Sequence, residues 1–200
     1  MGHERGELLR TTVVLGHRSR TGRQSVRMNI ELFKRTLRIA SVEEAVRMSP
    51  GELSDWHILS IRGRLNELPL NFPGARSVKT LHFDDVEADY PEDHLFAARP
   101  EDIEAALGFA RDVGEESLLI HCYAGISRST AIAWLIVYDK MKEQPDAVRV
   151  AFDIVRQLRP ILCPNRHVLR LGIKSLAAKE ERPGLHKQFK DCLEEVDPNP

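Results

Sequence analysis

At residues 121–130 the chain reads His-Cys-Tyr-Ala-Gly-Ile-Ser-Arg-Ser-Thr, and this stretch decides how the rest of the sequence is interpreted. Just before the cysteine, residues 117–121 form a short apolar run with the length and Leu/Ile content of a buried strand. Residues 131–137 are wholly apolar, as is typical of a buried helix. The pattern predicts a tight loop between a central strand and a central helix.

The residue types in this loop fit the chemistry of a phosphate group. Gly125 supplies the backbone freedom that a tight turn requires, and the loop amides at a helix N-terminus form a ready anion site. The guanidinium of Arg128 can bind two phosphoryl oxygens at once. The same positive field favours the thiolate of Cys122, and the Ser129 hydroxyl is placed to assist departure of the sulfur. We therefore expect sulfur to attack phosphorus here.

Residues 121–130 resemble the signature loop of the cysteine-dependent protein tyrosine phosphatase superfamily, and Ala-Gly-Ile-Ser-Arg-Ser at 124–129 is most similar to its dual-specificity branch. The resemblance implies that Cys122 is the nucleophile, Arg128 the phosphate clamp and Ser129 the helper of the second step. It also implies that backbone amides cradle the phosphate; these belong to Tyr123, Ala124, Gly125, Ile126, Ser127 and Arg128. No metal or other cofactor is expected. His121, behind the cysteine, is expected to orient the loop.

A phosphatase also needs a general acid to protonate the leaving oxygen. Residues 78–83 read as a strand, and Asp84 and Asp85 follow its carboxyl end, where ligands bind in open α/β sheets. In the resembling family the acid is an aspartate thirty to forty residues before the cysteine, which Asp84, Asp85 and Asp89 all satisfy. We predict Asp85, with Asp84 as the alternative. The other carboxylates of residues 84–104 are expected to face water.

A later segment, residues 159–165 (Arg-Pro-Ile-Leu-Cys-Pro-Asn), resembles the Pro-Asn segment of the same family. There the asparagine, Asn165 here, supports the signature loop by hydrogen bonding without taking part in the chemistry. Arg166 is expected to be an ordinary surface residue. A reversible disulfide between Cys163 and Cys122 under oxidation is a further hypothesis.

Composition places the chain among ordinary globular proteins. Apolar residues make up 42% of it, and the formal net charge of −1 provides no global attraction to nucleic acid or to an anionic membrane. Three cysteines, an odd number, do not form a disulfide framework and favour a reducing, cytoplasmic compartment. No stretch is long enough for a membrane span or a signal-peptide core. The oligomeric state is left open.

The remaining pattern predicts one α/β domain. Residues 37–41 and 56–62 read as strands and residues 42–48 as a short helix, while helical periodicities begin at Pro100, Ala147 and Val168. We predict a central mixed sheet of four to five strands flanked by helices, with the signature loop at a strand-to-helix junction. Residues 1–27 are expected to be a weakly ordered basic extension, 28–180 the catalytic domain and 181–200 a polar tail.

The sequence thus predicts a protein phosphatase that hydrolyses phosphotyrosine, with phosphoserine and phosphothreonine as further candidates. The substrate would be a phosphorylated protein or an aryl phosphate, because the loop interior carries no lysine and residues 84–104 are acidic. Three alternatives remain: a phosphoprotein-binding module without turnover, a phosphatase for a non-protein phosphomonoester, and a sulfur-transfer enzyme that carries a persulfide on the loop cysteine.

Overall fold

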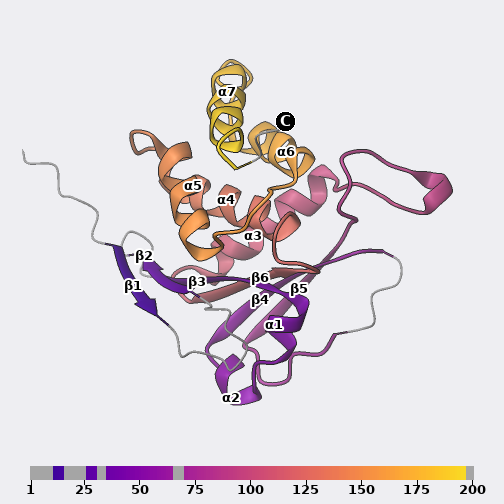
Figure 1. The fold of residues 1–200 in the computed structure, drawn as a ribbon, viewed down its shortest axis with the longest axis vertical. Coiled ribbons are helices and arrows are strands. Elements are labelled where there is room, and N and C mark those ends of the chain that lie inside the picture. Colours follow the sequence, from indigo (N-terminus) through magenta and orange to yellow (C-terminus); the bar gives the residue numbers. More distant parts are fainter. Residues whose placement is uncertain (1–10, 16–25, 31–34, 65–69, 197–200) are drawn as a thin grey trace, which may run out of the picture.

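A six-stranded mixed sheet forms the centre of the molecule (Figure 1). The computed structural model describes residues 11–15, 26–30, 35–64 and 70–196. The strand order is β1-β2-β3-β6-β4-β5, and β3, β6, β4 and β5 run parallel, while β1 and β2 pair antiparallel beyond β3. The strands are β1 (Thr11–Leu15), β2 (Val26–Ile30), β3 (Arg35–Ser41), β4 (Trp56–Arg62), β5 (Ser77–His82) and β6 (Ser117–Cys122).

Helices cover both faces of this sheet (Figure 1). On one face lie α3 (Pro100–Val113), α4 (Arg128–Met141), α5 (Ala147–Leu158) and α6 (Arg166–Leu176), with α7 (Arg182–Leu193) further out against α5 and α6. On the other face lie the short helices α1 (Val42–Val46) and α2 (Pro50–Leu53). The prediction of a mixed, helix-flanked sheet is therefore confirmed. With β1 and β2 the sheet has six strands, whereas four to five were predicted.

The period-2 alternation of strand side chains divides the core in two. In β6, Leu118 and Ile120 join the large core under α3 to α6, whereas Leu119 joins a smaller core with α1 and α2. All three residues are fully buried. This two-sided burial explains why the strand reads as a continuous apolar run, and it places the loop that follows β6 at the centre of the molecule.

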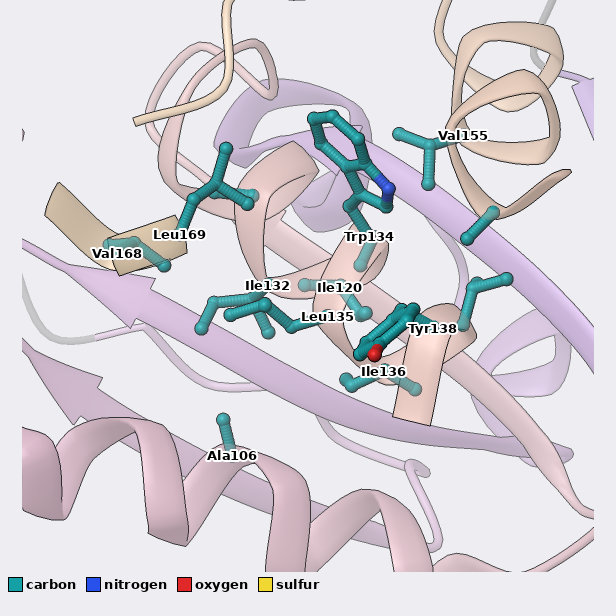
Figure 2. Packing of buried hydrophobic residues seen from close by; sticks show 14 of the residues in the cluster. Ala106, Ile120, Ile132, Trp134, Leu135, Ile136, Tyr138, Val155, Val168 and Leu169 are labelled. Carbon is teal, nitrogen blue, oxygen red and sulfur yellow. The ribbon is translucent and has the colours of Figure 1, made fainter. Parts of the chain in front are cut away.

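Helix α4 is the main support of the large core, and Figure 2 shows its side chains packed between β6 and the outer helices. Trp134 lies with its ring centroid 4.9 Å from that of Phe152 and 4.4 Å from that of Phe189, and its indole N–H donates to the carbonyl of Val148 at 3.1 Å. Such aromatic pairs add stability beyond the area that they bury. The helix that follows the signature loop is thus firmly held.

The two chain ends differ from the simplest expectation. Residues 181–200, predicted to be a polar tail, contain α7, whose Phe189 and Cys192 are buried in the large core. Burial raises the pKa of the Cys192 thiol, although Arg149 beside it acts in the opposite direction. Of the predicted basic extension, only β1 and the start of β2 fall within the described residues. The division into extension, catalytic domain and tail remains a prediction.

Candidate active site

The signature loop, residues 122–128, joins β6 to α4 as predicted. Gly125 has φ +71°, and a Cβ atom there would lie 2.6 Å from the carbonyl carbon of Ala40 and from the backbone nitrogen of Ser41. The loop therefore passes directly against the junction between β3 and α1. Both the positive φ and this close approach require glycine.

The predicted nucleophile lies at the base of the loop. Cys122 is 1% exposed, and its Sγ lies 3.2 Å from the Oγ of Ser129, which is itself completely buried in the first turn of α4. Within the described part of the chain, no other group forms a hydrogen bond with this Sγ, so the serine hydroxyl is the group best placed to act on the sulfur. The pairing that the sequence predicts for these two residues is present.

Arg128, the first residue of α4, is buried and turns toward β5. Its NH1 group donates to the carbonyl oxygen of Phe83 at 2.9 Å. Phe83 directly precedes Asp84 and Asp85, so this hydrogen bond links the predicted phosphate clamp to the segment that holds the candidate acids. A charged donor makes this a strong hydrogen bond.

The outer part of the loop is held by the α1 side of the sheet. The carbonyl of Tyr123 accepts from the N–H of Val42 at 3.0 Å, and the carbonyl of Ala124 accepts from Arg159 at 3.1 Å. The same guanidinium binds both carboxylate oxygens of Glu44 at 3.0 and 2.9 Å. Burial opposes ionisation of Glu44, but hydrogen bonds from Ser41 and Arg159 outweigh it and lower its pKa. An ion pair thus anchors the loop backbone.

The end of the loop is held by α4 itself and by the segment before α6. The carbonyl of Ile126 accepts from the N–H of Cys163 at 3.0 Å. The hydroxyl of Thr130 bonds the carbonyls of Ile126 and Ser127. The backbone carbonyls of Tyr123, Ala124, Ile126 and Ser127 thus accept hydrogen bonds from neighbouring segments, which fixes the course of the loop.

The two adjacent aspartates after β5 have different surroundings. Asp84 is 6% exposed, and its carboxylate accepts from the backbone N–H groups of Arg64 at 3.2 Å and Phe96 at 2.8 Å. Asp85 is exposed, and its Oδ1 accepts from the Ser127 hydroxyl at 2.6 Å. Of the two, Asp85 contacts the signature loop, whereas Asp84 binds the backbone of two residues outside that loop.

Asp89, the third aspartate at a suitable spacing, is occupied elsewhere. Its carboxylate forms an ion pair with Arg99 at 2.5 Å and accepts from the N–H of Ala97 at 3.0 Å. These bonds, led by the one from Arg99, hold its pKa below the usual value. A carboxylate held in its charged form by an arginine is a poor proton donor, so Asp89 fits a structural role.

Asn165 joins the signature loop to the acid loop, which we define as residues 84–99. Its backbone N–H donates to the carbonyl of Ser127 at 3.4 Å, as expected for a support of the signature loop. Its side-chain amide donates to Asp85 Oδ1 at 2.9 Å, a contact that the sequence did not predict. Its Oδ1 caps α6 by accepting from the N–H of Val168 at 3.0 Å.

His121 and Tyr123 lie on either side of the cysteine in very different environments. His121 is 1% exposed, and its ring packs edge-on against Phe72 with centroids 5.3 Å apart. Tyr123 is 66% exposed at the surface beside the loop. His121 is thus in contact with the smaller core, on the face of the sheet covered by α1 and α2, and its effect on loop orientation remains a prediction.

Sequence reasoning missed the contribution of α1 to the site. Ser41 and Glu44 form a capping box, in which each side chain accepts from the backbone N–H of the other residue. The Ser-x-x-Glu spacing before a helix is recognisable in sequence. What no local pattern could reveal is that Glu44 also binds Arg159, 115 positions away.

Two surface hollows lie away from the signature loop. One is between α3 and α4, and the other lies beside β5 and the start of α3. Neither hollow is lined by a residue of the signature loop. The candidate site is therefore identified by the contacts among its side chains and not by a hollow. Within the described ranges, His, Cys, Asp and Glu side chains do not gather in groups of three that could hold a metal, and no helix is long and apolar enough to cross a membrane.

Comparison with known proteins places this architecture. Neither a family model nor a curated protein sequence matches the chain. The human tyrosine phosphatase-like serine/threonine/tyrosine-interacting protein superposes with a TM-score of 0.52 at 20% identity, over 70% of this chain and 89% of that chain. The chain has a tyrosine phosphatase-like fold. The fold implied by the resemblance of the signature loop is therefore confirmed.

Further solved structures are similar to the phosphatase-like fold at lower scores. Human DUSP28 superposes with a TM-score of 0.49 at 17% identity, over 82% of this chain and 95% of that chain. A mouse putative dual specificity phosphatase complexed with zinc tungstate gives 0.47 at 19% identity, over 76% and 87%. A likeness of fold does not determine the chemistry, which depends on the residues of the site.

Proposed function

We propose that this protein is a cysteine-dependent phosphatase that hydrolyses phosphomonoesters through a cysteinyl-phosphate intermediate. The observation that carries the proposal is the arrangement around one loop: Cys122 with Ser129 at 3.2 Å, and Asp85 in contact with Ser127. Nucleophile, helper and acid come from three different elements, and the fold brings them together. A buried cysteine in an ordinary turn would need none of these partners.

The first step transfers the phosphoryl group to sulfur. The Cys122 thiolate attacks phosphorus in line with the ester bond, an S–P bond forms, and the P–O bond to the leaving group breaks. Arg128 and the loop amides hold the three equatorial oxygens, where charge is spread in the transition state. Protonated Asp85 donates its proton to the leaving oxygen, so that an alcohol or phenol departs in place of an alkoxide.

The second step returns the enzyme to its starting state. A water molecule attacks phosphorus and gives a proton to the Asp85 carboxylate, which now acts as a base. The S–P bond breaks, inorganic phosphate leaves, and the Cys122 thiolate reforms. The Ser129 hydroxyl, hydrogen-bonded to the sulfur, stabilises the developing thiolate and so assists this step.

We propose phosphotyrosine on a protein as the substrate, with phosphoserine and phosphothreonine as further candidates. The loop interior has no lysine, and the acid loop, continuing into α3, carries many carboxylates. Both features disfavour polyanionic substrates such as inositol lipids or RNA ends. The three free cysteines fit a reducing compartment, and we propose a cytoplasmic location on that ground.

A binding module without turnover is the alternative that the fold does not exclude. The structural neighbour with the highest TM-score among those named above is called tyrosine phosphatase-like and interacting. Turnover is favoured here because Cys122 is in contact with Ser129, and Asp85 is in contact with the signature loop through Ser127. A module that only binds phosphate would need Arg128 and the loop amides alone.

Hydrolysis of para-nitrophenyl phosphate by the wild type and Cys122→Ser, with a chelator present, tests the proposal. We expect metal-independent release of nitrophenol by the wild type and a loss of at least about 10⁴-fold in Cys122→Ser, because the hydroxyl is a far weaker nucleophile at neutral pH. A wild type that is inert toward aryl and peptide phosphates, yet binds a phosphotyrosine peptide, would establish the binding module in its place.

A further inference from the structure

The carboxylate of Asp85 is oriented by two donors that converge on one oxygen. Oδ1 accepts from the Ser127 hydroxyl at 2.6 Å and from the Asn165 side-chain amide at 2.9 Å. Among the residues that the structure describes, no side chain or backbone group donates a hydrogen bond to Oδ2 of this exposed carboxylate. The two carboxylate oxygens therefore differ: one is bound to the protein, and the other faces the space beside the loop.

Ser127 uses its hydroxyl in an unusual way for its position. It is the N-cap of α4, where serine normally accepts from the backbone N–H groups of the first turn. Here its side chain makes no such capping bond and donates to Asp85. The hydroxyl of Ser127 thus holds Asp85 in place of capping α4.

Asn165 is fixed in the one orientation that presents its amide to Asp85. It is 7% exposed, and its Oδ1 accepts from the N–H of Val168 as the cap of α6. Rotating the amide by half a turn would place the NH₂ group against that N–H, so the cap determines which atom faces Asp85. The same NH₂ group also lies 3.4 Å from the carbonyl of Val86.

Helix α6 holds the acid loop at two further points. His167 lies with Nε2 3.0 Å from the carbonyl of Ala98, at the far end of the loop. Arg170 forms an exposed ion pair with Glu87 at 3.2 Å. The loop otherwise projects from the body (Figure 1), so its placement over the signature loop depends on this helix.

We propose that Asn165 and Ser127 are positioning residues that set the direction in which Asp85 delivers its proton. This inference rests on the proposed phosphatase function and deepens it. With Oδ1 bound by two donors, Oδ2 carries the proton and faces the leaving oxygen. When either donor is lost, the Asp85 carboxyl can rotate, and proton transfer to the leaving oxygen becomes slower. The nucleophile and the phosphate clamp stay intact.

A change confined to proton transfer depends on the leaving group. Nitrophenolate leaves readily without a proton, whereas phenolate needs one, so a misplaced acid slows phenyl phosphate most. Asn165→Ser keeps an N-cap side chain for α6 but is too short to reach Asp85. We expect it to lower kcat/KM, which reports the first step and not the later hydrolysis, about 10- to 100-fold for phenyl phosphate and less than about 3-fold for para-nitrophenyl phosphate.

The matched control is Thr130→Val, which removes a hydroxyl that binds the carbonyls of Ile126 and Ser127 without touching Asp85. A purely structural disturbance of the loop lowers kcat/KM for both esters by the same factor, and Thr130→Val is expected to do so. Ser127→Ala should behave like Asn165→Ser. Addition of Asn165→Ser to Asp85→Asn should cost less than about twofold more, because residues that act through one group are not additive.

Equal losses for both esters in Asn165→Ser, or a full further loss on top of Asp85→Asn, would overturn the positioning role while the phosphatase function stands. If the wild type hydrolyses neither ester, the proposed function itself fails, and the positioning role fails with it. A steep leaving-group dependence in Asn165→Ser and Ser127→Ala, absent in Thr130→Val, establishes the role.

Discussion

The signature loop and the acid loop act together in the proposed reaction but are built in opposite ways. The signature loop lies between the central strand and the central helix, and most of its backbone carbonyls are bound by neighbouring segments. The acid loop projects from the body (Figure 1) and is held by side chains, among them Asp84, Asn165 and His167. The proposal thus combines a rigid phosphate site with a general acid whose position depends on a few polar contacts.

The largest effect that we expect is on kcat, and it should differ between substitutions of the two neighbouring aspartates. Asp85→Asn should lower kcat about 10²- to 10⁴-fold, the usual contribution of a general acid. The free energy of unfolding should change little, because Asp85 is exposed. Steady-state kinetics and urea denaturation of the same protein measure both quantities.

Asp84→Asn should show the reverse pattern. Its amide would oppose one of two buried N–H donors, which we expect to cost about 1–3 kcal/mol of unfolding free energy. The kcat of the folded fraction should fall far less than in Asp85→Asn. Loss of activity at unchanged stability in Asp84→Asn would identify Asp84 as the acid instead.

Glycine substitution tests the rigidity of the signature loop. In Gly125→Ala the new methyl group would meet the backbone of Ala40 and Ser41 at 2.6–2.7 Å, at a φ that alanine rarely adopts. We expect a loss of about 1–3 kcal/mol in stability together with a loss of activity, since the loop has to move. Thermal or urea unfolding and para-nitrophenyl phosphate turnover measure the two effects.

Gly108→Ala is the matched control, because a Cβ at this position in α3 meets no atom within 4 Å. Alanine in a helix interior should raise the free energy of unfolding by about 0.5–1 kcal/mol and leave kcat unchanged. If both alanine variants behave alike, the close passage of the signature loop against β3 is not a constraint.

The smallest effect concerns the ion pair that anchors the signature loop from α1. Glu44 has a pKa below its ordinary value of 4.5, because bonds from Ser41 and Arg159 outweigh the cost of burial. Its contribution to stability is therefore complete above that value and is lost as the pH falls through the lowered pKa. At pH 7 the free energy of unfolding of the wild type should be higher than that of Glu44→Gln by about 1 kcal/mol.

Urea titrations of both proteins between pH 7 and pH 3 would follow this difference, which should shrink only at the acid end. A gap between wild type and Glu44→Gln that is independent of pH would show that the carboxylate charge does not stabilise the loop. Arg159→Gln should lose the same pH dependence, because it removes the partner.

The sequence predicted the parts of the site that are local. Cys122, Gly125, Arg128 and Ser129 lie within one short stretch, so the spacing that gives them their roles is visible without a structure. The strand before the cysteine and the helix after it are also marked by their apolar runs. These are the parts that the structure places where they were expected.

The parts that depend on distant contacts were less accessible. The alternation of strand side chains does not distinguish two adjacent aspartates that lie past the end of a strand. The fold shows that Asp84 accepts hydrogen bonds from backbone N–H groups, while Asp85 accepts one from the Ser127 hydroxyl. Segment 181–200 reads as polar because just a few apolar side chains, Phe189 among them, enter the core. The partner of the Asn165 side chain lies 80 positions earlier in the chain.

The central claim, that Cys122 carries the phosphoryl group, is tested most directly by rapid-quench kinetics of Ser129→Ala with para-nitrophenyl phosphate. Without the hydroxyl beside Sγ, hydrolysis of the thiophosphate should become the slow step. We predict a burst of nitrophenol equal to the enzyme concentration, and a phosphoryl group found on Cys122 by mass spectrometry. Linear release without a burst, with no phosphorylated Cys122 in the quenched protein, would contradict the account.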